Sequence, residues 1–282
     1  MDFVMKLRNS AKENNSIVCM GMDPVLEKIP VKGKPGKVIE KFFSDILDAI
    51  VSENTRPGIV KPNYPFYAMY GFPGLRALKK VIRLYKKQKF LVILDSKRND
   101  IGNTSAAYAK EIFEFWKADA VTVAPYMGSD SVLPFVEYCS KGKGVYVLNR
   151  TSNPGASDFQ NLESNGIPLY MHVSNKIIEW HKQGIGAVVG ATYPKELEQI
   201  SSHFVNSGKE VQFLIPGVGT QGGSAAEVAE VLRKTNNELF LHRINSSSGI
   251  SYAYEKEGTD DYAGAAVRAI RKLNQEINLK AL

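Results

Sequence analysis

The stretch FLVILDSKRNDIGNTSAAYAKEIFEFWKADAVTV, residues 90–123, contains the repeating unit from which the fold can be predicted. It begins with a short apolar run at Phe90–Asp95, continues with apolar residues at helical spacing over Thr104–Lys117, and ends in a second apolar run at Ala120–Val123. Apolar runs that do not alternate with polar residues are typical of parallel strands buried on both faces. This stretch therefore predicts a strand, a helix and a second, parallel strand.

The same alternation extends over the whole chain and predicts an α/β fold, a single (β/α)8 TIM barrel domain over residues 1–282. An open doubly wound sheet is the alternative, but eight strands and no Gly-x-Gly-x-x-Gly after the first strand disfavour it. The expected strands are Ser16–Met22, Gly58–Lys61, Phe90–Asp95, Ala120–Val123, Val145–Leu148, Ala187–Val189, Val211–Ile215 and Leu239–Asn245. The expected helices are Val38–Asn54, Gly74–Lys87, Thr104–Lys117, Ser131–Cys139, Leu169–Gln183, Pro194–Ser207, Ser224–Lys234 and Asp261–Leu273.

Composition narrows the class of protein. The 282 residues are 44% hydrophobic and 23% charged, as in an ordinary globular protein, and no apolar run is long enough for a transmembrane helix. The first residues turn polar after Lys6, so we expect no secretory signal. The two cysteines, Cys19 and Cys139, lie in apolar stretches, which predicts a reduced, cytoplasmic setting. The four histidines lack metal-ligand spacing, so no metal site is expected.

The chain is basic, with 36 Lys and Arg against 29 Asp and Glu and a net charge of +7. The densest basic segment, Lys79–Lys87, has the spacing of a solvated helix face, and no nucleic-acid recognition motif accompanies it. The charge balance therefore favours an anionic small molecule as partner, with neither nucleic acid nor membrane.

Charged residues gather where the second and third expected strands end. Asp95 and Lys97 lie two apart on a segment that should be extended, so their side chains should point to the same side, and Lys61 should join them from the neighbouring strand. Such charges at the mouth of an apolar barrel are costly unless they are paired. Asp100 and Thr104, four apart at a helix start, share a face and are expected to point toward a partner chain.

Each of these residues also has a purely structural interpretation, since an Asp after a strand often caps a helix and Asp–Lys pairs are common on surfaces. Asp23, which precedes a proline, could belong to a plain turn. Two loops add further expectations. The glycine-rich segment at 217–223 has the flexibility of a phosphate-binding loop, and Arg150–Ile167 is long enough to form a lid.

Taken together, these motifs resemble those of a known enzyme family. LDSKRNDIGNTSAAYAK, residues 94–110, resembles the D-x-K-x-x-D-I signature of orotidine 5′-phosphate decarboxylase. Six other segments, in the same order along the chain, are similar to the longer bacterial and archaeal type of this enzyme: VCMGMDP (18–24), GIVKPNYPFY (58–67), ADAVTVAPYMGSDSVLPF (118–135), NRTSNPGASDFQ (149–160), VVGATYP (188–194) and IPGVGTQGG (215–223).

The resemblance implies a homodimer without cofactors that converts orotidine 5′-monophosphate to uridine 5′-monophosphate and CO2, the last step of de novo synthesis of this nucleotide. It implies that Lys97 delivers a proton to C6 of the pyrimidine and that Asp95 lies beside the leaving carboxylate. Asp100 would enter from the other subunit, and Lys61 would hold the charged array and contact the ribose. The implied substrate contacts are Asp23 and Asn63 with the ribose hydroxyls, Thr104 across the dimer, Ser152 at the pyrimidine edge, and Pro216 and Gln221 near the pyrimidine and phosphate.

One position departs from the family pattern. The family usually has a phosphate-binding arginine before the Gly-Ile of the eighth loop, and here Ser248 stands there, in NSSSGI. Arg243 lies five residues earlier, inside the expected strand, and cannot be assumed to replace it. The backbone N–H groups of Ser247, Ser248 and Gly249 could still hold the phosphate.

Three other functions fit the same barrel. Lys97 or Lys61 could form a Schiff base in a phosphosugar lyase, although flanking carboxylates oppose the lowered pKa that a nucleophilic lysine needs. A metal-dependent lyase is a second alternative. Because of Ser248, a nucleotide-binding barrel without activity is a third.

Overall fold

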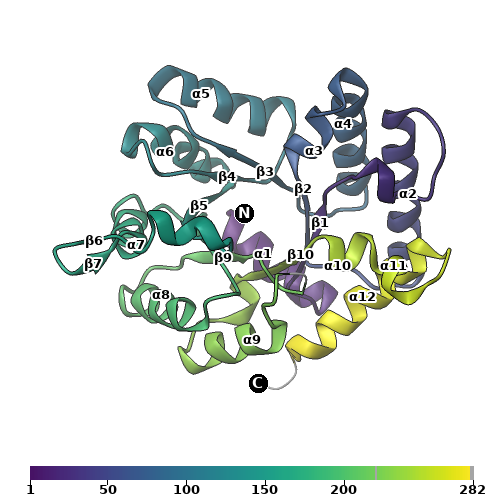
Figure 1. The fold of residues 1–282 in the computed structure, drawn as a ribbon. Coiled ribbons are helices and arrows are strands. Elements are labelled where there is room, and N and C mark those ends of the chain that lie inside the picture. The colour runs from purple at the N-terminus through teal and green to yellow at the C-terminus, as the bar shows by residue number, and fades with distance from the viewer. Residues whose placement is uncertain (220, 280–282) are drawn as a thin grey trace.

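Eight parallel strands form the centre of the molecule, and helices surround them (Figure 1). The computed structural model describes residues 1–219 and 221–279, so residues 220 and 280–282 of the predicted domain lie outside the described part. The hydrogen-bonded order is β2-β1-β10-β9-β8-β5-β4-β3, and isolated bridges join Val60 to Val92 and Asn63 to Asp95, which brings β3 back to β2. The predicted (β/α)8 TIM barrel is confirmed. Its strands are β1 Val18–Met22, β2 Ile59–Pro62, β3 Ile93–Arg98, β4 Ala120–Val123, β5 Gly144–Arg150, β8 Ile185–Val189, β9 Gln212–Ile215 and β10 Arg243–Ser246.

The outer helices pack amphipathic faces against the strands. In α2, for example, Phe42, Phe43 and Ile46 are fully buried because they recur at helical spacing on one face. Ser224 and Asp261, expected as first helical residues, are N-caps whose side chains accept backbone N–H groups of the first turn. The outer helices are α2 Pro35–Ser52, α4 Gly71–Lys87, α5 Gly102–Lys110, α6 Ser129–Val136, α7 Leu169–Glu179, α8 Pro194–Asn206, α9 Ala225–Lys234 and α12 Tyr262–Ile277. Shorter helices are α3 Tyr64–Ala68, α10 Ser248–Ser251 and α11 Ala253–Glu257.

Three expected elements are partly wrong, and in one of them, Ser131–Cys139, a 3-10 turn follows the α-helix after Val136. The first half of the expected strand Leu239–Asn245 is a 3-10 turn, η5 Leu239–Leu241, and β10 starts only at Arg243. A short apolar run does not distinguish a strand from a buried helical turn. The expected helix Thr104–Lys117 changes character after Lys110, because the N–H of Trp116 bonds to the carbonyl of Glu111, five residues back, in a π-helical segment.

The expected lid segment between β5 and α7 has local structure of its own. It contains a 3-10 turn, η4 Pro154–Asp158, and a small antiparallel pair, β6 Glu163–Ser164 with β7 Ile167–Pro168. Phe159, directly after η4, is 64% exposed, so the segment carries an apolar side chain that its own fold leaves uncovered. Its closure over a ligand stays a prediction.

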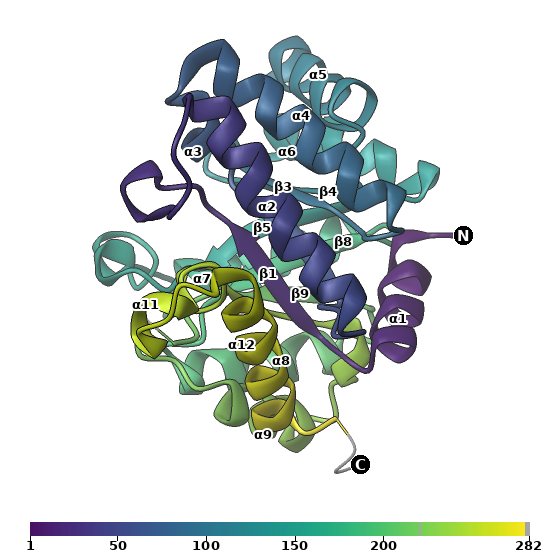
Figure 2. The same cartoon turned by 90° about the vertical axis from the view of Figure 1, so that its right-hand side faces the viewer.

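A helix that the sequence did not lead us to expect, α1 Phe3–Asn14, covers the amino-terminal end of the barrel. Figure 2 shows α1 at one end, and the loop after β1 together with α11 at the opposite end. Phe3 packs edge-to-face on Tyr146 of β5 with 6.2 Å between ring centroids, and Leu7 is fully buried beside it. These two side chains close one layer of the barrel interior formed by Cys19, Ile59, Ile93, Ala120, Tyr146, Val188 and Leu214.

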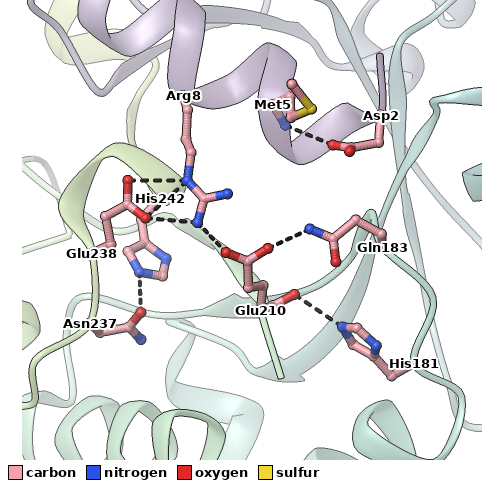
Figure 3. Close-up of polar contacts among 9 residues, drawn as sticks. All are labelled: Asp2, Met5, Arg8, His181, Gln183, Glu210, Asn237, Glu238 and His242. Carbon is pink, nitrogen blue, oxygen red and sulfur yellow. Dashed lines mark hydrogen bonds and ion pairs between the residues drawn. The ribbon is translucent and has the colours of Figure 1, made fainter. Parts of the chain in front are cut away.

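A polar network ties α1 to the loops beneath the barrel (Figure 3). Arg8 of α1 donates to both carboxylate oxygens of Glu238 and also pairs with Glu210. Glu210 in turn accepts from Gln183, and its backbone carbonyl bonds to His181. One side chain of α1 therefore links three segments that are far apart in the sequence.

His242, also in Figure 3, is a fully buried neutral imidazole. Its Nδ1 accepts from the backbone N–H of Phe213 at 3.0 Å, so its Nε2 carries the proton and donates to Asn237 Oδ1 at 2.8 Å. Burial, with the nearby charges of Arg243 and Arg8, lowers the pKa of His242 to about 3. Protonation of Nδ1 would place its N–H group opposite the backbone N–H of Phe213, so that two hydrogen-bond donors would face each other in the protein interior.

We predict that the protein loses stability on mild acidification because of His242. Its folded pKa is depressed, so the unfolded chain takes up the proton first, and stability falls as the pH drops below the unfolded value of about 6.5. Between pH 7.5 and 5.0 the loss is about 2 kcal/mol. Urea unfolding of wild type and His242→Gln at both pH values measures it. An equal pH slope in the two proteins would contradict the prediction.

Candidate active site

Three of the four predicted catalytic residues meet at the carboxyl-terminal end of the barrel. Lys61 Nζ, at the end of β2, donates to Asp95 Oδ2 at 2.8 Å, and Lys97 Nζ donates to Asp95 Oδ1 at 2.7 Å. The side chains of Lys61 and Asp95 are 5% and 7% exposed, whereas Lys97 is 51% exposed. The carboxylate is thus buried between two ammonium groups, of which one faces the outside.

The charges of this cluster support one another. Burial opposes the charge on Lys61, but attraction to Asp95 and Asp23 outweighs it and raises the pKa of Lys61 above its usual value. Burial also opposes the charge on Asp95, yet Lys61 and Lys97 hold the pKa of Asp95 well below its usual range. At neutral pH the cluster therefore contains an anion and cations.

Thr122, in the middle of β4, organises this cluster, and sequence reasoning missed it. Between the paired positions Leu94–Val121 and Arg98–Val123, three residues of β3 lie opposite Thr122 alone, so β3 bulges. The Thr122 hydroxyl accepts the backbone N–H groups of Ser96 and Lys97 at 3.1 and 3.0 Å, and donates to Asp95 Oδ1 at 2.8 Å. A β-branched residue is ordinary in a strand, so the sequence carries no signal for this role.

The bulge corrects one argument made from the sequence. Asp95 and Lys97 were expected to share a side because the segment was taken as extended. Instead, Lys97 has a φ of 43°, in the left-handed region that residues other than glycine seldom adopt. The two side chains meet, but they do so across a bulge.

Asp100 lies apart from the cluster in its own chain. Its carboxylate accepts the backbone N–H of Ile101 at 2.8 Å, and among the described residues no ion pair joins it to a lysine. Thr104, in the first turn of α5, is exposed. Both residues are placed where another chain could reach them, and their predicted role across a dimer stays a prediction.

A cavity of about 280 Å³ lies among the segments that follow β1, β9 and β10, and five of the predicted substrate contacts line it. These are Asp23, Pro216, Gln221, Ser247 and Ser248. One of them, Asp23, is near enough to the cluster for its charge to act on Lys61. Gly21 of β1 allows the close approach of Ser247, because an added Cβ would lie 1.8 Å from its hydroxyl oxygen. Two buried oxygens at the cavity, Asp23 Oδ1 and Asn245 Oδ1, have no hydrogen-bond partner among the described residues, so they are positioned to accept from a ligand.

Two further predicted contacts, Ser152 and Asn63, lie close by, outside that lining. Ser152 packs against Gly217 of the glycine-rich loop, where an added Cβ would lie 3.0 Å from its own. Asn63 follows β2 and pairs with Asp95 through an isolated bridge. Sequence reasoning did not single out Lys28 and Tyr252, which also line the cavity. In the described part of the chain, no group of three or more His, Cys, Asp and Glu side chains is arranged to hold a metal ion.

Comparison with known proteins places the chain in a family. The sequence profile of the orotidine 5′-phosphate decarboxylase / HUMPS family matches residues 16–259. The chain belongs to this family.

Relatives of the orotidine 5′-phosphate decarboxylase family match nearly the full chain. An orotidine 5′-phosphate decarboxylase of Dehalococcoides mccartyi is 36% identical, over 99% of this chain and 98% of that protein. One of Dechloromonas aromatica is 40% identical over 96% of each. Among solved structures, OMP decarboxylase of Leishmania donovani is 30% identical with a TM-score of 0.78, covering 99% of this chain and all of that one.

We predict that Asp95 contributes more to the stability of the fold than Lys97 does. Asp95→Asn leaves the buried ammonium of Lys61 without its nearest counter-ion and should destabilise the protein by about 3 kcal/mol at pH 7. Lys97→Ala removes a half-exposed partner and should cost less than about 1 kcal/mol. Urea denaturation measures both. An Asp95→Asn protein as stable as wild type would show that the Lys61 ammonium can stay buried without its ion pair to Asp95.

Proposed function

We propose that this protein decarboxylates orotidine 5′-monophosphate to uridine 5′-monophosphate and CO2, the last step in de novo synthesis of that nucleotide. The observation that carries the proposal is the Asp95 carboxylate held between Lys61 and Lys97 at the mouth of the barrel. The names of the relatives support the same reaction, because orotidine 5′-phosphate decarboxylases match almost the whole chain.

In this proposal Lys97 is the proton donor. Loss of CO2 leaves an electron pair on C6 of the pyrimidine without a neighbouring carbonyl to receive it. The developing negative charge must therefore be stabilised by a fixed positive charge and then protonated. The Lys97 ammonium suits both tasks, since it is half exposed while Asp95 fixes it from the buried side.

Asp95 and Lys61 act by holding that ammonium in place. Asp95 accepts from Lys61, Lys97 and Thr122, so its position is determined before substrate arrives. Such preorganisation lowers the barrier because no dipole has to reorient during the reaction. We assign Asp95 chiefly this positioning role beside the leaving carboxylate, and Lys61 a contact with the ribose.

The cavity lined by Asp23 takes the rest of the nucleotide. We assign Asp23 and Asn63 to the ribose hydroxyls and Ser152 to the pyrimidine edge. Pro216 and Gln221 lie near the pyrimidine and phosphate, and the backbone around Ser247 and Ser248 holds the phosphate. The free oxygen of Asp23 supports the ribose contact, since a ribose hydroxyl would supply the donor that it lacks among the described residues.

We propose that two copies of the chain share their active sites. Asp100 and Thr104 would complete the site of the partner. Exposed apolar side chains lie on the segments that follow β2, β3 and β4, including the first turn of α4, where a second copy would cover them. They are Met69, Phe72, Ile101, Tyr126 and Met127, exposed by 62%, 76%, 51%, 84% and 43%.

The proposed reaction uses no cofactor and no metal, and we place the enzyme in the cytoplasm. Burial raises the pKa values of the Cys19 and Cys139 thiols to about 12, so both stay protonated, as suits a reducing compartment. Among the described residues, no helix is both long enough and apolar enough to cross a membrane. Nucleic acid has no part in the proposal.

The Schiff-base alternative fits the site less well. A nucleophilic lysine needs a lowered pKa, whereas the carboxylates around Lys61 raise its pKa, and Lys97 donates to the same Asp95. Borohydride trapping with substrate tests this alternative. A metal-dependent lyase would lose activity in EDTA, and a barrel that only binds nucleotides would take up uridine 5′-monophosphate without turnover of the orotidine nucleotide.

We predict that Lys97→Ala abolishes turnover while the fold is retained. Removal of both the proton donor and the stabilising charge should lower kcat by a factor of about 10³ or more. Ultraviolet-monitored conversion of orotidine 5′-monophosphate in EDTA measures the rate, with Lys110→Ala on the exposed side of α5 as a matched control. A Lys97→Ala enzyme with wild-type rates would overturn the assignment.

We predict that two inactive variants restore activity when they are mixed. In a dimer of Lys97→Ala with Asp100→Asn, one site would combine the intact Lys97 of one chain with the intact Asp100 of the other. Random pairing after denaturation and refolding of an equal mixture should then give about a quarter of wild-type activity. Activity no higher than the sum of the separate variants would show that Asp100 acts within its own chain.

A further inference from the structure

The phosphate of the proposed substrate needs a positive charge in the cavity, and Ser248 does not supply it. Arg243 does not supply it either, since it is fully buried beneath the barrel, where it donates to the carbonyls of Leu7, Phe240 and His242. A phosphate dianion bound only by neutral donors would lack the direct attraction of a positive side chain and the two parallel hydrogen bonds that an arginine can supply. The structure offers another cation.

Lys28 is the one residue with a cationic side chain among the described residues that line the cavity. It ends the 3-10 turn η1 Leu26–Lys28, which follows β1, and β1 pairs with β10, the strand that leads to Ser247 and Ser248. The loops after neighbouring strands lie side by side, so Lys28 extends beside the loop on which an arginine was expected.

Tyrosines of the eighth loop fix the segment that carries Lys28. Tyr252 accepts the backbone N–H of Val25 at 2.8 Å and donates to the carbonyl of Asp23 at 2.9 Å. Tyr254 donates to the carbonyl of Lys28 itself. The backbone of η1 is therefore anchored at the cavity, while the Lys28 side chain, 46% exposed, can change its partner.

The present partner of Lys28 is Glu255. Lys28 Nζ lies 2.9 Å from Glu255 Oε2 and 5.5 Å from the ring centroid of Tyr252. Both side chains of the pair are more than a third exposed, so the pair contributes little to stability. A phosphate dianion carries more negative charge than a carboxylate and can displace Glu255 from the lysine.

We propose that Lys28 binds the substrate phosphate, in place of an arginine at position 248, and that Glu255 holds Lys28 until the phosphate arrives. This inference rests on the proposed function, because it takes the phosphate group from the proposed substrate. It assigns opposite effects to the two members of one ion pair. Lys28 favours the phosphate, and Glu255 competes with it.

The test compares binding of uridine 5′-monophosphate and uridine, which differ only in the phosphate, by titration calorimetry at low salt. Lys28→Gln should weaken nucleotide binding about tenfold or more and leave uridine binding unchanged. Glu255→Gln should tighten nucleotide binding or leave it unchanged. Lys32→Gln, in the same loop and exposed, controls for the general effect of one lost charge.

The direction in which each substitution changes nucleotide affinity shows whether Lys28 binds the phosphate or only helps to hold the two loops together. If the ion pair only held the two loops together, Lys28→Gln and Glu255→Gln would weaken binding of the nucleotide equally, and the proposal would be wrong. A second arm adds Ser248→Arg. With an arginine there, Lys28→Gln should cost less than about twofold, because the new guanidinium takes over the phosphate.

The outcomes also separate this inference from the proposed function. A wild-type protein that decarboxylates orotidine 5′-monophosphate, with Lys28→Gln retaining the full preference for nucleotide over uridine, overturns the role of Lys28 and leaves the proposed function intact. A wild-type protein that neither turns over the substrate nor prefers the nucleotide overturns both.

Discussion

A single buried carboxylate, that of Asp95, determines how the carboxyl-terminal end of this barrel is arranged. Without it, the ammonium groups of Lys61 and Lys97 would repel each other, and the buried Lys61 would lose its main source of stabilisation. With it, both lysines are held within 3 Å of one carboxylate, and Thr122 adds a third donor. The bulge of β3 and the unusual backbone of Lys97 fit this arrangement, since the same Thr122 hydroxyl satisfies the two N–H groups that the bulge removes from the sheet.

The two ends of the barrel use similar side chains for different purposes. Beneath the barrel, the hydrogen-bonding groups of Arg243 and His242 mostly find partners within the chain, and α1 covers them. At the other end, oxygens of Asp23 and Asn245 stay without partners among the described residues, and Lys97 remains half exposed. Satisfied polar groups stabilise a fold, whereas unsatisfied ones at a cavity favour a ligand. Beneath the barrel, Arg243 Nε and Tyr146 Oη also lack partners among the described residues, so the functional end is distinguished by the cavity that Asp23 and Asn245 line.

The sequence predicted those features that depend on periodicity and on neighbouring strands. The eight strands and the meeting of Lys61 with Asp95 follow from a parallel barrel in which β2 and β3 are adjacent. It did not predict what depends on local backbone geometry. The bulge at Lys97 and the role of Thr122 require a hydroxyl opposite three residues, and no pattern of apolar residues encodes that. Nor did it predict α1, because a short amphipathic segment outside the strand–helix repeat has no expected place until the open end of the barrel is known.

The position of α1 also matters for handling the protein. In Figure 2, α1 lies at the end of the barrel opposite the loop after β1, and residues of that loop line the cavity. A tag, a fluorophore or a solid support attached ahead of α1 would therefore leave the cavity facing free solution. The same arrangement limits how close such an attachment can come, since Phe3 and Leu7 of α1 are fully buried against the barrel. A spacer ahead of α1 would keep Phe3 and Leu7 packed against the barrel when the protein is attached to a sensor surface.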